Sequence, residues 1–243
     1  MSKIFEKYNK RGAYHWEMIS RNLNTHRPFT VARYKICLEM LGDVRGKMIV
    51  DFGCGDGALA GLIAKAGGVI IGFDSNETGL SLAKDKFNKY GLSGTFHSKL
   101  SMLSNELYDA VVCSDVIEHV DNPEEIMKEI FRILKPGGNA VISTPIRLAE
   151  EPWDKEHIRE YFPSEFNNLC AKYGSIVEIK QAIPIAAQDL LYYKEGIIGR
   201  ILNLILRIRS AWMNSNYLLN WKGLNRYFVL QIAIVKKNRY DHK

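Results

Sequence analysis

Three glycines at alternate positions follow an apolar run and an acid in this 243-residue chain. The stretch reads Ile49-Val50-Asp51-Phe52-Gly53-Cys54-Gly55-Asp56-Gly57. Glycine has no Cβ, so a tight turn of this kind between a strand and a helix brings backbone N–H groups directly against a ligand. The spacing indicates a loop that binds a nucleotide-type cofactor.

Two features argue against a dinucleotide as the ligand, although Gly53, Gly55 and Ala58 could be fitted to the dinucleotide fingerprint. Asp51 precedes the first glycine by two residues. Its carboxylate would repel a pyrophosphate and attract a sulfonium or amino group. The later run from Leu134 to Gly138, Leu-Lys-Pro-Gly-Gly, is also not required by any dinucleotide scheme.

A second group of reactive side chains follows a later predicted strand. Glu118 and His119 are adjacent there, and His157 lies in a loop further along the chain. Imidazole titrates near neutral pH and can take a proton from a hydroxyl, so Glu118, His119 and His157 are candidate catalytic residues, with His15 as a third candidate base. The alternative is that Glu118 and His119 only fix the loop and the start of the next helix.

The elements that must position these groups alternate between strands and helices. Strands are predicted at residues 47–52, 69–74, 95–97, 108–114, 139–144, 175–183 and 227–236, and helices at 15–23, 28–42, 58–66, 76–90, 122–134, 164–172 and 197–213. Such alternation indicates an α/β protein with a parallel, doubly wound sheet. We expect a single domain over 1–243, with a helical N-terminal cap at 1–42 and an inserted segment at 184–224.

The inserted segment is basic and amphipathic. The chain has a net charge of +6, and the residues from Gly196 to Lys243 contain nine Lys or Arg but one acid, which leaves residues 1–195 slightly acidic. Within 197–213 the polar residues Arg200, Asn203, Arg207 and Ser210 recur at helical spacing. Packing against the core, contact with an anionic membrane surface and contact with a partner all remain open.

Cysteine usage and hydropathy bear on the compartment. The four cysteines are far apart and form no CxxC pair, so neither a disulfide framework nor a zinc cluster is expected. The first residues carry charges where a signal peptide needs an apolar core, and no run of 18 uncharged apolar residues occurs. We therefore expect a cytoplasmic protein that contacts the inner face of the membrane peripherally if residues 197–213 bind lipid.

Taken together and in this order, the motifs resemble those of class I S-adenosylmethionine-dependent methyltransferases. The similarity is carried by residues 50–57, 72–74, 108–120 and 134–138. The Glu-His-Val that ends the third of these is similar to that of the O-methyltransferases of ubiquinone biosynthesis and of related small-molecule and sugar enzymes. The resemblance implies a Rossmann-like, seven-stranded, mostly parallel sheet with strand order 3-2-1-4-5-7-6 and an antiparallel last strand.

The resemblance also implies S-adenosylmethionine as cofactor, with S-adenosylhomocysteine as product. The cofactor-binding residues that it implies are Arg33, Asp51, Gly53, Cys54, Gly55, Asp74, Ser75, Ser98, Leu100, Cys113 and Ser114. Arg33 would pair with the cofactor carboxylate, and Asp74 would bind the ribose hydroxyls. Many relatives carry an acid beside the adenine, whereas here Ser98 and the backbone up to Leu100 take that place.

We expect methyl transfer to a hydroxyl of a small-molecule, sugar or lipid-linked acceptor. Amino methyltransferases with Asn/Asp-Pro-Pro-aromatic after the fourth strand differ from this chain, which reads Ser114-Asp115-Val116-Ile117. Asp115, Glu118, His119 and His157 resemble the metal-binding set of small-RNA 2′-O-methyltransferases, but Asp replaces the first Glu and no RNA-binding module is evident. We therefore expect no metal and no nucleic acid; a cofactor-binding regulatory protein without catalysis is the remaining alternative.

Overall fold

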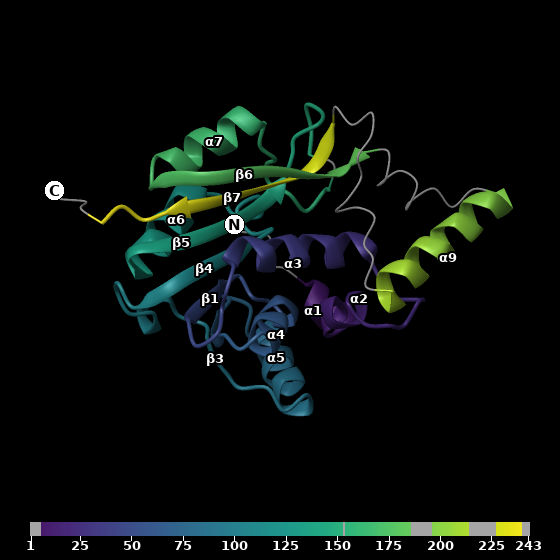
Figure 1. Cartoon of the computed structure of the whole chain (residues 1–243), viewed down its shortest axis with the longest axis horizontal. Coiled ribbons are helices and arrows are strands. Elements are labelled where there is room, and N and C mark those ends of the chain that lie inside the picture. The colour runs from purple at the N-terminus through teal and green to yellow at the C-terminus, as the bar shows by residue number, and fades with distance from the viewer. Residues whose placement is uncertain (1–5, 153, 186–195, 214–226, 240–243) are drawn as a thin grey trace.

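The computed structural model describes residues 6–152, 154–185, 196–213 and 227–239 and contains one mixed sheet (Figure 1). Its strands are β1 (Met48–Phe52), β2 (Val69–Phe73), β3 (Gly94–His97), β4 (Tyr108–Ser114), β5 (Leu134–Pro145), β6 (Ser175–Pro184) and β7 (Phe228–Lys236). The strand order is β3-β2-β1-β4-β5-β7-β6, and β7 pairs antiparallel with both β5 and β6. The predicted sheet order is confirmed.

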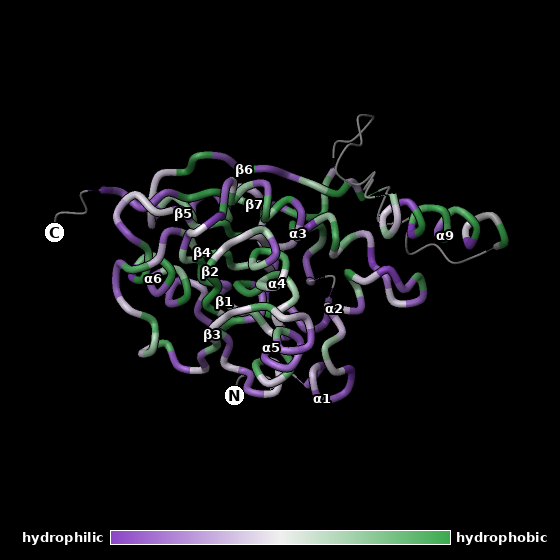
Figure 2. Tube along the Cα trace, turned by 60° about the horizontal axis from the view of Figure 1, so that its bottom comes forward, coloured by the Kyte–Doolittle hydropathy of each residue, from purple (hydrophilic) through white to green (hydrophobic). Residues whose placement is uncertain are grey.

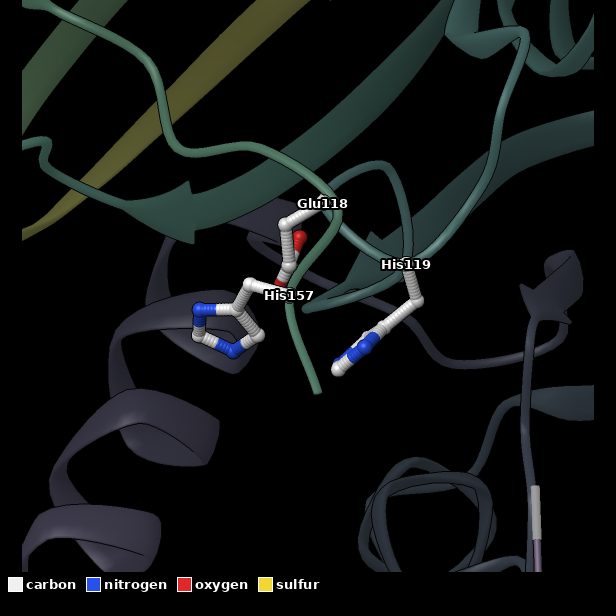
Figure 3. Close-up of side chains that lie close together, drawn as sticks. All are labelled: Glu118, His119 and His157. Carbon is white, nitrogen blue, oxygen red and sulfur yellow. The ribbon is translucent and has the colours of Figure 1, made fainter. Parts of the chain in front are cut away.

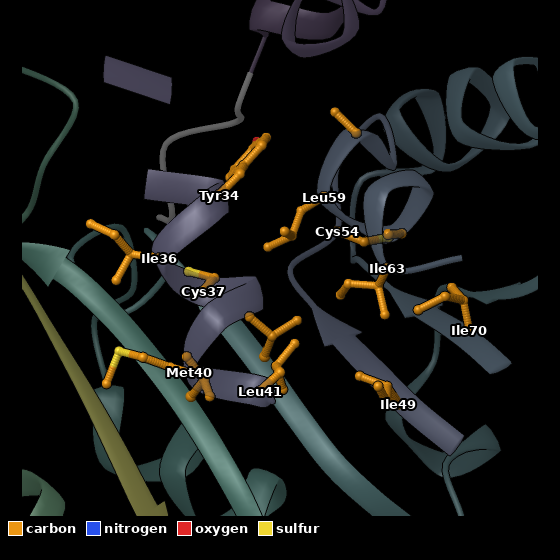
Figure 4. Close-up of a cluster of buried hydrophobic side chains, with 14 of the residues drawn as sticks. Tyr34, Ile36, Cys37, Met40, Leu41, Ile49, Cys54, Leu59, Ile63 and Ile70 are labelled. Atoms are coloured by element: carbon orange, nitrogen blue, oxygen red, sulfur yellow. The ribbon is translucent and has the colours of Figure 1, made fainter. Parts of the chain in front are cut away.

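Helices cover both faces of this sheet. On one face lie α3 (Pro28–Leu41), α4 (Ala58–Lys65) and α5 (Glu77–Lys89), whose apolar side chains form one buried cluster with the strands (Figure 4). On the other face, α6 (Pro123–Ile133) and α7 (Pro163–Ala171) contribute to a second cluster. Neighbouring β1 residues divide between the two, with Ile49 in the first and Val50 in the second. The central strands β1, β2 and β4 are mainly apolar because both of their faces are buried, whereas β6, at one end of the sheet, is largely exposed.

The sequence predicted a strand that begins at residue 139, after the Lys-Pro-Gly-Gly run, and this predicted start is wrong. In the structure β5 begins at Leu134, which pairs with Tyr108. The register of the ladder then shifts before Asn139 pairs with Ala110. Gly137 has a φ of +78°, which glycine adopts without strain. The run is therefore an irregularity within the strand pairing, of the kind that a β-bulge produces.

The N-terminal cap contains two short helices, α1 (Lys7–Arg11) and α2 (Tyr14–Met18). Before residue 28 the sequence predicted only one helix, at 15–23. The helix α2 ends earlier, at Met18, where the chain bends back toward α3. Trp16 is buried and its indole Nε1 donates to the backbone oxygen of Asp56, at 2.7 Å. The Trp16 ring lies against α4 at Gly61, where an added Cβ would be 2.3 Å from the ring. The cap is thus fastened to the glycine loop and to the helix that follows it.

Between β6 and β7 lies α9 (Gly196–Trp212), close to the predicted helix at 197–213. Within the predicted cap and insertion, residues 1–5, 186–195 and 214–224 lie outside the described residues. All four cysteines are free and buried. Among the helices that the structure describes, none has the length and apolar character needed to cross a membrane.

Candidate functional site

The predicted cofactor residues gather where the sheet order reverses, between β1 and β4. The chain runs from β1 outward to β2 and β3, then returns to β4 on the other side of β1. In open α/β sheets, ligands bind at the carboxyl ends of the strands at such a reversal. Asp51 is in β1, Asp74 directly follows β2, and Ser114 ends β4. The structure therefore brings these three predicted residues to the side of the sheet where its parallel strands end.

The glycine loop is held tightly by its neighbours. The backbone N–H groups of Gly53 and Cys54 both donate to the carbonyl of Phe73, at 2.7 and 2.9 Å. Gly53 has a φ of +79°, and a Cβ at this position would lie 2.4 Å from the side chain of Val116. A larger residue at Gly53 would therefore strain the backbone and push away the loop that follows β4.

Asp74 joins the glycine loop to the start of α5. One carboxylate oxygen accepts the backbone N–H of Gly55 at 2.7 Å, and the other accepts that of Asn76 at 2.8 Å. Burial raises the pKa of Asp74, although both hydrogen bonds oppose that change. The backbone N–H of Asp74 donates to His97, which ends β3, so Ser98 follows at the same sheet edge. Ser75, Ser98 and Leu100 remain predicted cofactor contacts.

Asp51 is a buried carboxylate whose side chain is not fully satisfied by the protein. It is 2% exposed, and its Oδ2 has no hydrogen-bond partner among the described residues. Burial raises the pKa of Asp51 to about 7 because the charged form loses its hydration. A cationic donor beside this oxygen would satisfy it and favour ionisation. Asp51 therefore suits a cationic ligand group, and the sequence predicted a sulfonium or an amino group here.

Arg33 in α3 forms an ion pair with Asp115, in the loop after β4. Asp115 has a φ of +54° and also accepts the Ser143 hydroxyl at 3.0 Å. The Nε atom of Arg33 is buried and has no hydrogen-bond partner among the described residues. The predicted pairing of Arg33 with a cofactor carboxylate stays a prediction, and the structure adds a protein carboxylate to its surroundings.

Two cysteines that were predicted to contact the cofactor have side chains that are more deeply buried than that of Ser114. The side chain of Cys113 is fully buried in the cluster on the α6 face, so it can contact a ligand only through its backbone. Cys54 is also buried, in the cluster on the opposite face. Ser114 is half-buried, and its hydroxyl lies 2.9 Å from that of Ser143.

The structure brings Glu118, His119 and His157 together (Figure 3). One potential ligand atom from each lies within 4.8 Å of the other two, and the two imidazole centroids are 4.9 Å apart. The loop after β4 supplies Glu118 and His119, and the loop after β5 supplies His157. A backbone hydrogen bond from Ile158 to Glu118, at 2.8 Å, ties the two loops together. His15 lies elsewhere, since its backbone N–H donates to Asp56.

Each member of this cluster has a defined protein partner. The Oε2 of Glu118 accepts the Thr144 hydroxyl at 3.0 Å, and burial raises the pKa of Glu118 well above its usual range. The Nδ1 of His119 lies 3.1 Å from the carbonyl of Glu156, and burial lowers the pKa of His119. A neutral His119 therefore donates from Nδ1. The three groups could act on a proton or hold a divalent cation.

Three residues near the site were missed by sequence reasoning. Glu160 is buried and its Oε1 lies 2.7 Å from Nδ1 of His157, a contact that the His-x-x-Glu spacing could have suggested. Asp56, inside the glycine motif, holds the cap through the N–H of His15, at 2.8 Å. Tyr8 is buried against Gly55, where an added Cβ would be 1.8 Å from its hydroxyl. No pattern in the sequence marked Tyr8.

Known proteins resemble this chain in sequence and in fold. A profile described as a methyltransferase domain matches residues 24–179, more than half of the chain. The ubiquinone biosynthesis O-methyltransferase of Hydrogenovibrio crunogenus is 29% identical over 198 residues, which cover 76% of this chain and 79% of that protein. The corresponding protein of Pseudomonas fluorescens is 32% identical over 106 residues, 42% of this chain and 46% of that protein, so this match spans less than half of the relative.

A solved structure provides a further comparison. Phosphoethanolamine N-methyltransferase 2 of Haemonchus contortus, in complex with S-adenosyl-L-methionine, is similar with a TM-score of 0.66. The sequence identity is 18%, and the alignment covers 96% of this chain and 58% of that chain. At this identity the similarity shows a shared fold.

The buried Asp51 carboxyl predicts a pH-dependent stability. Folded Asp51 keeps its proton up to about pH 7, whereas an unfolded Asp releases it near pH 3.9. The folded state thus binds more protons between these values, so the free energy of unfolding falls as pH rises from about 4 to 7, by up to about 4 kcal/mol. Urea unfolding at pH 5 and pH 8 measures this change. Between these two pH values the free energy of unfolding should decrease less for Asp51→Asn than for the wild type. The exposed Asp43→Asn is the control, and an unchanged decrease in Asp51→Asn would contradict the assignment.

Proposed function

We propose, from the premise that this chain belongs to the methyltransferase-domain family, that it transfers a methyl group to a hydroxyl of a small-molecule, sugar or lipid-linked acceptor. The cofactor is S-adenosylmethionine, which supplies a methyl group on a positively charged sulfur. One observation carries the proposal. The oriented imidazole of His157 and the buried, unsatisfied carboxylate of Asp51 both belong to the carboxyl-terminal side of the same sheet.

The chain's own residues would hold the cofactor at the β1–β4 reversal. Asp51 offers a buried carboxylate oxygen to the amino group, and Arg33 offers its unsatisfied Nε to the carboxylate. Asp74 would bind the ribose hydroxyls, and Ser98 and the Leu100 backbone would contact the adenine. Gly53 and Gly55 would contact the methionine part through their backbones, since Val116 and Tyr8 fill the space that a Cβ would take at each glycine.

Proton removal is assigned to His157. Because Nδ1 of His157 donates to the buried Glu160 carboxylate at 2.7 Å, its Nε2 is left as the basic atom. When the acceptor oxygen bonds to the methyl carbon, the bond between that carbon and the cofactor sulfur would break, with its electron pair going to the sulfur, and the hydroxyl proton would move to Nε2 of His157. Glu160 is a positioning residue that fixes the tautomer and ring orientation, as carboxylates do for histidines in other sites. His119 and Glu118 lie beside His157 and bind the acceptor.

An oxygen acceptor is favoured over nitrogen. A neutral amine is already nucleophilic and needs mainly alignment, whereas a hydroxyl gains from a base within reach. The ubiquinone biosynthesis O-methyltransferases are named for oxygen acceptors, while the structural neighbour from Haemonchus is an N-methyltransferase. The oriented His157 supports the oxygen acceptor. Turnover of S-adenosylmethionine to S-adenosylhomocysteine with a panel of phenols and sugars distinguishes this enzyme from a regulatory protein that only binds the cofactor.

The role of Asp51 is tested by cofactor affinity. Asp51→Asn keeps the shape of the side chain and removes the charge, so S-adenosylhomocysteine should bind about 30-fold more weakly or worse. Isothermal titration calorimetry measures this, with the exposed Asp43→Asn as a control that keeps wild-type affinity. Equal affinity of the Asp51 variant and the wild type would exclude Asp51 from the site.

The role of His157 is tested by turnover. His157→Gln should lower kcat by about 100- to 10,000-fold with an acceptor found in the panel, because the base is lost. Affinity for S-adenosylhomocysteine should not change. His97→Gln, in β3, is the matched control and should retain activity. A His157 variant with wild-type kcat would contradict the assigned base.

A divalent cation is the second candidate for the cluster of Glu118, His119 and His157. One carboxylate and two imidazoles within 4.8 Å form a plausible ligand set, and the Oε1 of Glu118 has no hydrogen-bond partner among the described residues. The primary proposal gives these groups a role in proton transfer and acceptor binding. Dialysis against EDTA should therefore leave methyl transfer unchanged. Loss of activity that magnesium or manganese restores would instead establish a metal-assisted enzyme.

A further inference from the structure

The helix α9 presents its apolar side chains outward. Ile197 is 77% exposed and Trp212 is 59% exposed, whereas Asn203 and Ser210 are 8% and 5% exposed. A surface helix of a globular protein normally shows the reverse arrangement, with its apolar stripe against the core. Packing of this apolar stripe against the core, one of the options that the sequence left open, is therefore excluded for the described residues.

The polar side of α9 holds the helix to the protein. Arg207 donates from Nη1 to the backbone carbonyl of Leu23 at 2.9 Å, in the segment before α3. Trp212, at the end of the apolar side, makes one further contact, since the guanidinium of Arg21 lies 5.2 Å from the centroid of its ring. Leu206 packs on the edge of the buried cluster that includes α3. Figure 1 shows α9 at the edge of the molecule, beside the cap, so its opposite side is directed away from the body.

The outward side forms one continuous apolar stripe. Its exposed members are Ile197, Ile201, Leu204, Ile205, Ile208 and Trp212. With about 3.6 residues per turn, these positions share one face of the helix, and Arg200 and Arg209 lie on its two flanks. Both arginines are exposed, and α9 contains no acidic residue. Figure 2 shows the apolar colouring along α9, interrupted by polar positions.

We propose that α9 is a docking helix for an anionic lipid bilayer. Helices of this type lie in the membrane interface with the apolar face among the acyl chains and the basic side chains at the headgroups. Arg200 and Arg209 are placed on either flank to meet those headgroups. None of the described helices could span the bilayer, so the contact is peripheral.

A second copy of the chain fits this surface less well. Two α9 helices packed face to face would bring together arginines without any acidic partner on either helix. Uncompensated like charges across an interface are costly. An anionic bilayer instead neutralises both flanks while it covers the apolar stripe.

Sedimentation of the full chain with vesicles tests this proposal. The wild type should bind phosphatidylcholine vesicles that contain phosphatidylglycerol, bind pure phosphatidylcholine weakly, and be released by high salt. The double variant Ile201→Glu and Ile205→Glu should bind at least about tenfold more weakly, because two charges enter the apolar stripe. Both positions are exposed, so the variant should keep the wild-type circular dichroism spectrum and melting temperature.

Two controls make the outcome decisive. Val177→Glu places the same kind of charge on an exposed apolar residue of β6 and should bind vesicles like the wild type. Equal losses in Val177→Glu and in the α9 variant would overturn the assignment to α9. Absence of vesicle binding at low salt would overturn the membrane proposal. A wild type that binds no vesicles but is a dimer in sedimentation velocity, with a monomeric double variant, would show instead that α9 contacts a second copy. Cofactor affinity is measured in parallel and does not depend on either result.

Discussion

The ion pair between Arg33 and Asp115 connects the two parts of the site. It joins α3, which covers the β1 side, to the loop that leaves β4. Asp115 takes a positive φ, and the chain turns there before it reaches Glu118 and His119. A non-glycine residue in this conformation needs surrounding contacts to hold it, and Arg33 and Ser143 supply them. The positions of Glu118 and His119 thus depend on the contacts that hold Asp115.

Buried acids at this edge of the sheet have a cost that ligands can offset. Asp51, Asp74 and Glu118 each lose hydration on folding, which raises their pKa values. Asp74 is compensated by two backbone N–H groups, but Asp51 and Glu118 each keep one oxygen without a hydrogen bond among the described residues. In the proposed function, these two oxygens accept hydrogen bonds from the cofactor and from the acceptor. Binding should therefore stabilise the fold as well as prepare the reaction.

The cap connects α9 to the glycine loop. Trp16 and Tyr8 bring the N-terminal helices onto the glycine loop, and Arg207 fastens α9 to the segment between these helices and α3. If α9 lies on a bilayer, the cap and the cofactor loop would be held close to that surface. An apolar or lipid-linked acceptor could then reach the site without crossing much water, which agrees with the proposed class of acceptor.

Sequence alone was sufficient for the regular elements. The apolar runs and glycine turns placed most of the strands and helices within a few residues, because strands covered on both faces are recognisable by composition. The family motifs then supplied the sheet order. The cap was only partly predicted, since its mixed polar and aromatic residues have no clear period.

The amino-acid sequence determined the glycine loop, its preceding acid and the strand order, because these depend on local geometry and on motifs at fixed spacing. Only the tertiary structure decided that Glu160 orients His157, that Arg33 pairs with Asp115 and that Tyr8 packs on Gly55. It also decided which side of α9 faces the protein. The helical period of α9 was evident in its sequence, but the facing surface was not, because that depends on contacts between segments nearly two hundred residues apart.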